Sequence, residues 1–142
     1  MKKLTKPKQY RKLFIEAERL WKEIAFLRYG RECQVRKNYP NIWIVHTNVL
    51  QIDHVITRRD KNLFFHVFNG VPVCSTCNRA KCFHQKGIAY AIEQIAVAKI
   101  GALEFGLMME LHQTGTPNTN WKKLFWIEKV VEELKFHRDS LT

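Results

Sequence analysis

The chain has 142 residues, 46% of them hydrophobic, which is enough for one domain with a buried core. A net charge of +11 at pH 7 and a pI near 9.7 indicate a polyanionic partner. No apolar stretch reaches the roughly 18 residues that span a membrane, and none follows the basic start as in a signal peptide, so we expect a cytoplasmic protein.

The positive charge is concentrated toward the N-terminus. The net charge is +8 over residues 1–40, +4 over residues 41–86 and −1 over residues 87–142. A merely soluble basic protein would not need this gradient, whereas a phosphate-binding surface on the first part of the chain produces it. Residues 1–9 are expected to form a loose basic arm.

An amphipathic helix is predicted over residues 10–28, where apolar side chains recur at helical spacing. Residues 42–45 and 49–52 are rich in β-branched side chains and predict a hairpin. Residues 71–73, Val-Pro-Val, predict a short edge strand, because proline cannot donate to a central ladder. The aromatic segment over residues 63–68 is expected to pack beneath these strands.

The C-terminal part has a helical pattern throughout. Two apolar stripes are expected, separated by a break at Gly101 or Gly106. They comprise Ile88, Ala91, Ile92, Ile95 and Ala98, and then Leu103, Leu107, Met108 and Leu111. A turn-rich linker over residues 114–120 supplies an N-cap from Asn118, Thr119 or Asn120 to a last helix over residues 121–137. The apolar stripe of this helix is expected at Leu124, Ile127, Val131 and Leu134.

The most distinctive stretch runs from Gln51 to Lys81. It contains an Asp-His pair, a basic loop, Asn-Gly before the Val-Pro-Val strand, and Cys-x-x-Cys-Asn-Arg-x-Lys. Each part has an ordinary interpretation alone, as a strand end, a turn or a helix cap. In this order and spacing they resemble the HNH nucleases, which use a ββα-metal finger and one divalent cation to cut a phosphodiester.

The resemblance implies a role for four polar residues. His54 would be the general base, because a neutral imidazole takes a proton from water near pH 7 when its other nitrogen is held. Asp53 and Asn78 would bind Mg²⁺ or Mn²⁺ through oxygen atoms, which these ions prefer. Asn69 would brace the intervening loop and so orient His54. The phosphates of DNA would be bound by Arg58, Arg59, Arg79 and Lys81.

The four cysteines are expected to be thiols or metal ligands rather than disulfides, as in a reducing compartment. Zinc-containing HNH proteins have a second Cys-x-x-Cys upstream, but here Arg36 replaces its second cysteine. Cys33, Cys74 and Cys77 are therefore the candidate zinc ligands. Either Cys82, His84 or His46 completes a four-coordinate site, or the zinc has been lost and Arg36 supplies a fixed charge instead.

The order of elements is also similar to that of the phage NinG (Rap) recombination endonucleases, although Asp53 stands where we associate a small residue with that family. This resemblance implies cleavage of branched DNA in a bacterial or phage-infected host cell. The prediction is thus an α+β fold, with the arm, a helix and the HNH core over residues 1–86 and a helical extension over residues 87–142, forming a single domain. The main alternative is a non-catalytic zinc-knuckle DNA-binding module, and a further one is a protein-binding adaptor that has lost its activity.

Overall fold

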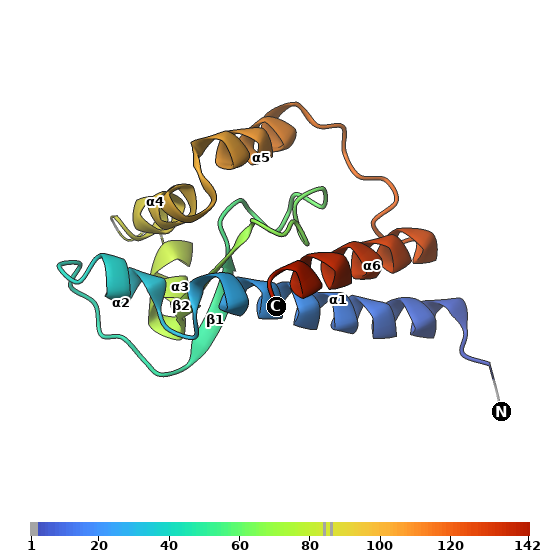
Figure 1. Ribbon diagram of the computed structural model, residues 1–142, viewed down its shortest axis with the longest axis horizontal. Coiled ribbons are helices and arrows are strands. Elements are labelled where there is room, and N and C mark those ends of the chain that lie inside the picture. Colours follow the sequence, from blue (N-terminus) through green and yellow to red (C-terminus); the bar gives the residue numbers. More distant parts are fainter. Residues whose placement is uncertain (1–2, 84, 86) are drawn as a thin grey trace.

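The computed structural model describes residues 3–83, 85 and 87–142, and it is α+β and mostly helical (Figure 1). The described residues form one two-stranded antiparallel sheet and six helices. None of these helices is both long enough and apolar enough to cross a membrane. In chain order the elements are α1 (Lys6–Tyr29), α2 (Gln34–Asn38), β1 (Leu50–His54), β2 (Gly70–Cys74), α3 (Ser75–Cys82), α4 (Ile88–Ile100), α5 (Ala102–Thr114) and α6 (Leu124–Ser140).

The first helix, α1, begins earlier than predicted. Pro7 stands in its first turn, where a missing N–H costs nothing, so the helix starts at Lys6 and residues 6–9 of the expected loose arm are helical. It ends before Gly30, whose φ of 90° is unfavourable for other residues. Among the apolar side chains that recur at helical spacing in α1, Ala17, Leu20 and Ile24 are fully buried.

The last helix, α6, lies alongside α1, so that the two ends of the chain form one helix pair (Figure 1). The predicted stripe is confirmed at Ile127, Val131 and Leu134, which are buried against α1. The predicted cap is wrong: α6 begins at Leu124 after Lys123, and the Asn118 side chain instead accepts a hydrogen bond from the Asn120 N–H within the preceding turn.

The two strands pair in register from Leu50 opposite Cys74 to His54 opposite Gly70. Gly70 is required here, because a Cβ would lie 2.8 Å from Ile52 and 2.9 Å from Trp21. The predicted hairpin of residues 42–45 with 49–52 is wrong, since β1 pairs with β2 and residues 42–49 form no strand. The alternation in residues 42–45 still determines which side chains face the core: Ile42 and Ile44 are half-buried, whereas Trp43 and Val45 are exposed.

Helix α3 follows β2 without a loop and begins at Ser75. Further on, Gly101 separates α4 from α5 with a φ of 93°, as one of the two predicted breaks. The predicted α4 stripe is buried except for Ala98. The α5 stripe is largely wrong, because Leu103, Leu107 and Leu111 are exposed and Phe105 and Met108 provide the buried contacts.

Candidate functional site

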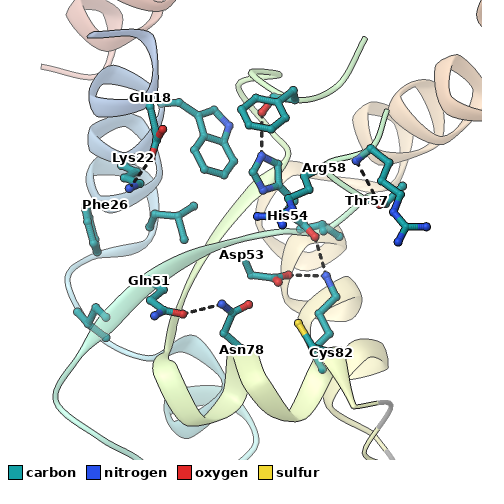
Figure 2. A pocket seen from close by; sticks show the side chains of 17 residues that line it. Glu18, Lys22, Phe26, Gln51, Asp53, His54, Thr57, Arg58, Asn78 and Cys82 are labelled. Atoms are coloured by element: carbon teal, nitrogen blue, oxygen red, sulfur yellow. Dashed lines mark hydrogen bonds and ion pairs between the residues drawn. The ribbon is translucent and has the colours of Figure 1, made fainter. Parts of the chain in front are cut away.

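A cleft of about 900 Å³ lies between α1, β1 with the loop that follows it, and α3 (Figure 2). The antiparallel pairing puts the C-terminal end of β1 beside the N-terminal end of β2, and α3 follows directly from β2. Residues distant in sequence therefore face one opening. Asp53, His54 and Asn78, three of the four predicted polar site residues, all line it.

The His54 ring is fixed on three sides. It stacks on Trp21 of α1 with centroids 4.3 Å apart, and it also contacts the Phe64 ring. Its Nε2 lies 3.0 Å from the Phe64 carbonyl oxygen, which can only accept, so Nε2 carries the proton and Nδ1 keeps a free lone pair. Burial, and then the positive charges of Lys81 and Arg58, lower the pKa of His54 to about 4 despite that hydrogen bond. The imidazole is therefore neutral at pH 7.

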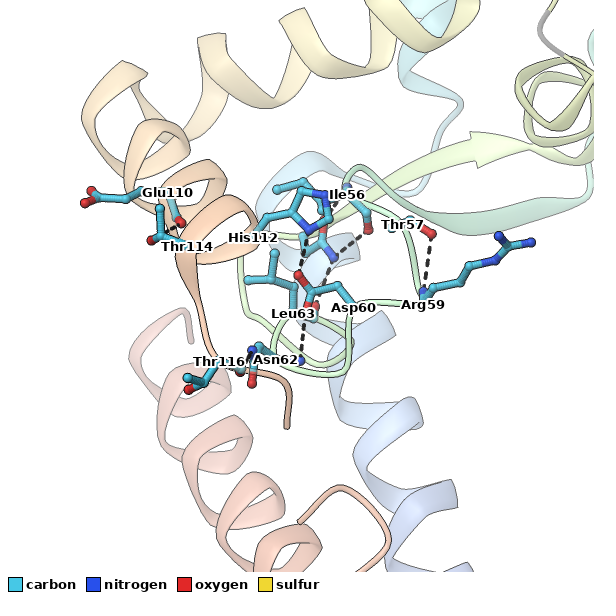
Figure 3. Close-up of polar contacts among 11 residues, drawn as sticks. Ile56, Thr57, Arg59, Asp60, Asn62, Leu63, Glu110, His112, Thr114 and Thr116 are labelled. Atoms are coloured by element: carbon cyan, nitrogen blue, oxygen red, sulfur yellow. Dashed lines mark hydrogen bonds and ion pairs between the residues drawn. The ribbon is translucent and has the colours of Figure 1, made fainter. Parts of the chain in front are cut away.

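Asn69 braces the loop between the strands. It is fully buried, and its side chain accepts from the Ile56 N–H at 2.7 Å and donates to the carbonyls of Ile56 and Leu63. Since Leu63 directly precedes Phe64, these bonds hold the carbonyl that contacts His54. On the outer side of the same loop, Asp60 accepts from the Asn62 N–H and pairs with His112 of α5 (Figure 3).

Asp53 is buried and already holds a cation. Its Oδ2 lies 2.6 Å from Nζ of Lys81, which also donates to the His54 carbonyl oxygen at 2.6 Å. Burial raises the pKa of Asp53, and Lys81 only partly opposes this effect. A buried carboxylate with an incompletely offset charge is a group to which a further cation can bind.

Asn78 extends from the first turn of α3 into the same cleft. Its Nδ2 donates to Gln51 Oε1 at 2.6 Å, and in Figure 2 its amide lies between Gln51 and Asp53. With its nitrogen on Gln51, the Asn78 amide leaves its oxygen available as a ligand.

The four predicted phosphate-binding residues divide between two places. Arg58 and Arg59 are exposed on the rim of the cleft, and neither forms an ion pair with a described residue. Lys81 lines the cleft but is engaged by Asp53. Arg79 does not line it and faces another hollow beside α3. Three of the four predicted residues are thus gathered at the cleft.

A separate cluster contains all three predicted thiol ligands and identifies the fourth member. Cys33, Cys74, Cys77 and His46 place their ligand atoms within 4.8 Å of one another. Nδ1 of His46 lies 3.4 Å from the sulfurs of Cys74 and Cys77 and 3.8 Å from that of Cys33. Among the alternatives for the fourth ligand, Cys82 is exposed at the cleft and His84 lies outside the described residues.

This cluster can hold a metal ion such as zinc. Four ligands in a tetrahedron around Zn²⁺ stand roughly 3.5–3.8 Å apart, given Zn–S bonds near 2.3 Å. The distances of 3.4 and 3.8 Å from His46 and the 3.8 Å between the sulfurs of Cys33 and Cys77 are close to these values. Arg36 does not take the missing cysteine's place, because its side chain is exposed.

The thiols in the cluster influence one another's protonation. A hydrogen bond from Cys77 lowers the pKa of Cys33 to about 4, although burial opposes this effect. The same shared proton, together with burial, raises the pKa of Cys77. A thiolate at Cys33 is thus favoured, and a bound divalent cation would favour deprotonation of Cys77 as well.

Two residues that matter here are missing from the predicted set, and no sequence signal identifies them. Trp21 stacks on His54 from 33 positions earlier in the chain, and the helical pattern marks it only as an apolar position. Gln51 holds Asn78, yet in sequence it is an ordinary strand residue. A scan against family models and searches of curated proteins and solved structures found no match to this chain.

Proposed function

We propose that this protein is a metal-dependent endonuclease of the HNH type that hydrolyses DNA phosphodiester bonds, with branched recombination intermediates as its preferred substrates. The observation that carries the proposal is the state of His54. A neutral, stacked imidazole with Nε2 on a carbonyl leaves Nδ1 as the base, beside a carboxylate and an amide oxygen.

The donor set at the cleft fits Mg²⁺ or Mn²⁺. Asp53 and Asn78 would hold the ion, since both offer oxygen atoms and Asp53 is buried with its charge only partly offset by Lys81. Such an ion, held by Asp53 and Asn78, would stabilise negative charge on the phosphate and on the leaving oxygen. Lys81 would then give up or share Asp53, and its ammonium group becomes available to the substrate.

The remaining steps belong to the protein side chains. His54 takes a proton from the attacking water through Nδ1, while the Phe64 carbonyl and the Trp21 ring keep the imidazole from turning. Asn69 acts through the loop and is a positioning residue. Arg58 and Arg59, exposed on the rim, bind the phosphates on either side of the bond to be cut.

The alternative function is a non-catalytic zinc-knuckle module that binds DNA. Its supporting observation is the Cys33, His46, Cys74 and Cys77 cluster, which offers a four-ligand set where the sequence shows an incomplete cysteine quartet. In this alternative Asp53 and Lys81 form only a structural ion pair.

Cleavage of supercoiled plasmid and of a four-way DNA junction, with and without Mg²⁺ or Mn²⁺, separates the two functions. We expect metal-dependent cleavage, and a loss of about 10²–10⁴-fold in rate for His54→Ala with DNA affinity unchanged. Asn120→Ala, in a turn away from the cleft, is the control. DNA binding without cleavage under any metal condition would favour the zinc-knuckle module.

A further inference from the structure

A second hollow, of about 350 Å³, lies beside α3 and is lined by two exposed aromatic rings. Trp43 is 92% exposed and Phe83 is 73% exposed. Phe136 of α6 is similarly exposed, at 74%, but does not line this hollow. Trp43 comes from the unpaired segment before β1, and Phe83 directly follows α3. Exposed apolar surface that is contiguous and concave marks ligand-binding or interaction sites, whereas single exposed rings do not.

The fold explains why Trp43 points outward but does not require an aromatic residue there. Ile42 and Ile44 are half-buried against the core, so the intervening Trp43 must face solvent in an extended chain. Its ring pairs with no other aromatic ring in the described part of the chain. Any polar residue would satisfy the backbone equally well, and both ring faces remain available to a ligand.

The charge beside the rings is positive and unpaired. Arg79 of α3 is exposed, lines the same hollow, and forms no ion pair with any described residue. It directly follows Asn78, which faces the candidate catalytic cleft. The cleft and the hollow therefore lie on two sides of one short helix, α3. A DNA strand with a phosphate at Asn78 would have Arg79 as the next residue of that helix.

We infer that Trp43 and Phe83 stack on an unpaired nucleobase of a DNA strand that crosses α3, while Arg79 binds the adjacent phosphate. Every base offers an aromatic face, so such stacking is tolerant of sequence, but it requires a base that is free of its partner. The inference rests on the DNA binding in the proposed function and deepens it: the preferred substrate has unpaired bases next to the cleavage site.

The test compares binding to two DNA duplexes by fluorescence anisotropy, without added Mg²⁺ or Mn²⁺ so that no cleavage occurs. One duplex is blunt, and the other carries a single-stranded extension of thymidines. We expect the unaltered protein to bind the extended duplex about 5- to 150-fold more tightly, as stacking on one exposed base provides. Trp43→Ala and Phe83→Ala should each reduce this preference, while Phe136→Ala, on α6, should keep it.

A third duplex shows whether the bases themselves are bound. Abasic sites in the extension should remove the preference of the unaltered protein and change nothing further in Trp43→Ala. Circular dichroism of each variant checks folding, which loss of a ring 92% exposed should not disturb. A preference that survives Trp43→Ala, or equal binding of abasic and thymidine extensions, would overturn the inference.

The outcomes also separate this inference from the proposed nuclease. Binding of the extension through Trp43, with no cleavage in any metal, supports the inference and contradicts the catalytic proposal. Metal-dependent cleavage with no preference for the extension supports the catalytic proposal and contradicts this inference. Sedimentation measurements test whether the two rings bind a second copy of this chain instead of DNA. If Trp43→Ala dissociates a dimer and leaves DNA binding unchanged, the rings form a protein interface and the inference is wrong.

Discussion

Burial of His54 between Trp21 and Phe64 controls its protonation. The unfolded chain binds a proton on this imidazole below a pH of about 6.5, whereas the folded chain resists it until about pH 4. The pKa of His54 is thus lower in the folded state. The contribution of this group to the free energy of unfolding is fully present above about pH 6.5 and is lost as the pH falls toward 4.

This pH dependence can be measured without any assumption about function. Urea unfolding between pH 7 and pH 4 should show the free energy of unfolding falling by up to about 1.4 kcal/mol per pH unit from this one group. His54→Gln has no titrating ring and should remove that part of the slope. His66, whose pKa is also lowered by burial, provides the matched comparison. An identical slope in His54→Gln would show that His54 is not protonated on unfolding in this range.

The ion pair of Lys81 with Asp53 should matter more for stability than any surface pair. Removing one partner of a buried pair leaves an uncompensated charge, and Asp53 is only 6% exposed. Lys81→Met should therefore cost about 3–5 kcal/mol at pH 7, and the double variant Asp53→Asn with Lys81→Met should recover most of it. Lys129→Met, at an exposed pair on α6, should change stability by no more than about 0.5 kcal/mol.

The same variants test metal binding at the cleft. If a divalent cation binds Asp53, Mg²⁺ should stabilise Lys81→Met more than it stabilises the unaltered chain, because the ion no longer displaces an ammonium group. Thermal unfolding with and without Mg²⁺ measures this difference. An equal effect of Mg²⁺ on both proteins would remove Asp53 from the proposed ligands.

Among the helices, α2 and α3 both begin at thiols of the metal-binding cluster. Cys33 precedes α2, and Cys74 precedes α3 and accepts from the Cys77 N–H. The segment that carries His46 has no strand partner. It reaches these helix starts through the contacts of His46 with the three sulfurs and through a hydrogen bond between the hydroxyls of Thr47 and Ser75. A metal ion here would therefore join the start of α2, the segment around His46 and the start of α3, which the pairing of β1 with β2 does not connect.

Metal analysis of the purified protein should find about one Zn²⁺ per chain, and a chelator should lower the melting temperature, since metal-binding energy is then folding energy. Cys74→Ser and His46→Ala should lose the zinc and most of the stability. Cys82→Ser, the exposed thiol outside the cluster, is the control and should lose neither. Absence of zinc, with a cost of only about 1–3 kcal/mol for Cys74→Ser, would mean that the thiols only pack.

The whole molecule combines a small sheet with a long α1 that forms part of both the core and the cleft. Trp21 stacks on His54 on one side, and Leu20 and Ile24 are buried in the cluster that holds α6. The N-terminal turns of α1 carry Lys6, Lys8, Arg11 and Lys12, all exposed. This helix therefore links the most basic part of the chain to the candidate catalytic histidine.

DNA binding should depend steeply on salt, because each phosphate neutralised contributes about −0.9 to the slope of log K against log salt. Replacing Lys6, Lys8 and Lys12 by Gln should reduce the slope and the preference for branched over linear DNA while cleavage at His54 persists. Lys129→Gln, remote on α6, should leave both unchanged. Equal cleavage of branched and linear DNA by the full chain would contradict the structure-selective proposal.

Much of this protein follows from local sequence patterns. Hydrophobic periodicity predicts the long helices and the α6 stripe, and residues with special backbone preferences predict the edge strand with Pro72 and the break at Gly101. Both signals depend only on residues close together in the sequence. The order of Asp-His, Asn-Gly and Cys-x-x-Cys likewise placed His54, Asp53 and Asn78 as candidates, and the structure gathers all three at one cleft.

Only the tertiary structure determines which residues contact one another across the chain. Whether residues 42–45 form a strand depends on which segment pairs with β1, and β2 provides that partner from 20 positions further on. His46 becomes the fourth cluster member, Trp21 the stacking partner and Lys81 the counter-ion because the fold brings them within contact distance. No local pattern encodes such contacts, since their energy arises only when distant residues are buried together.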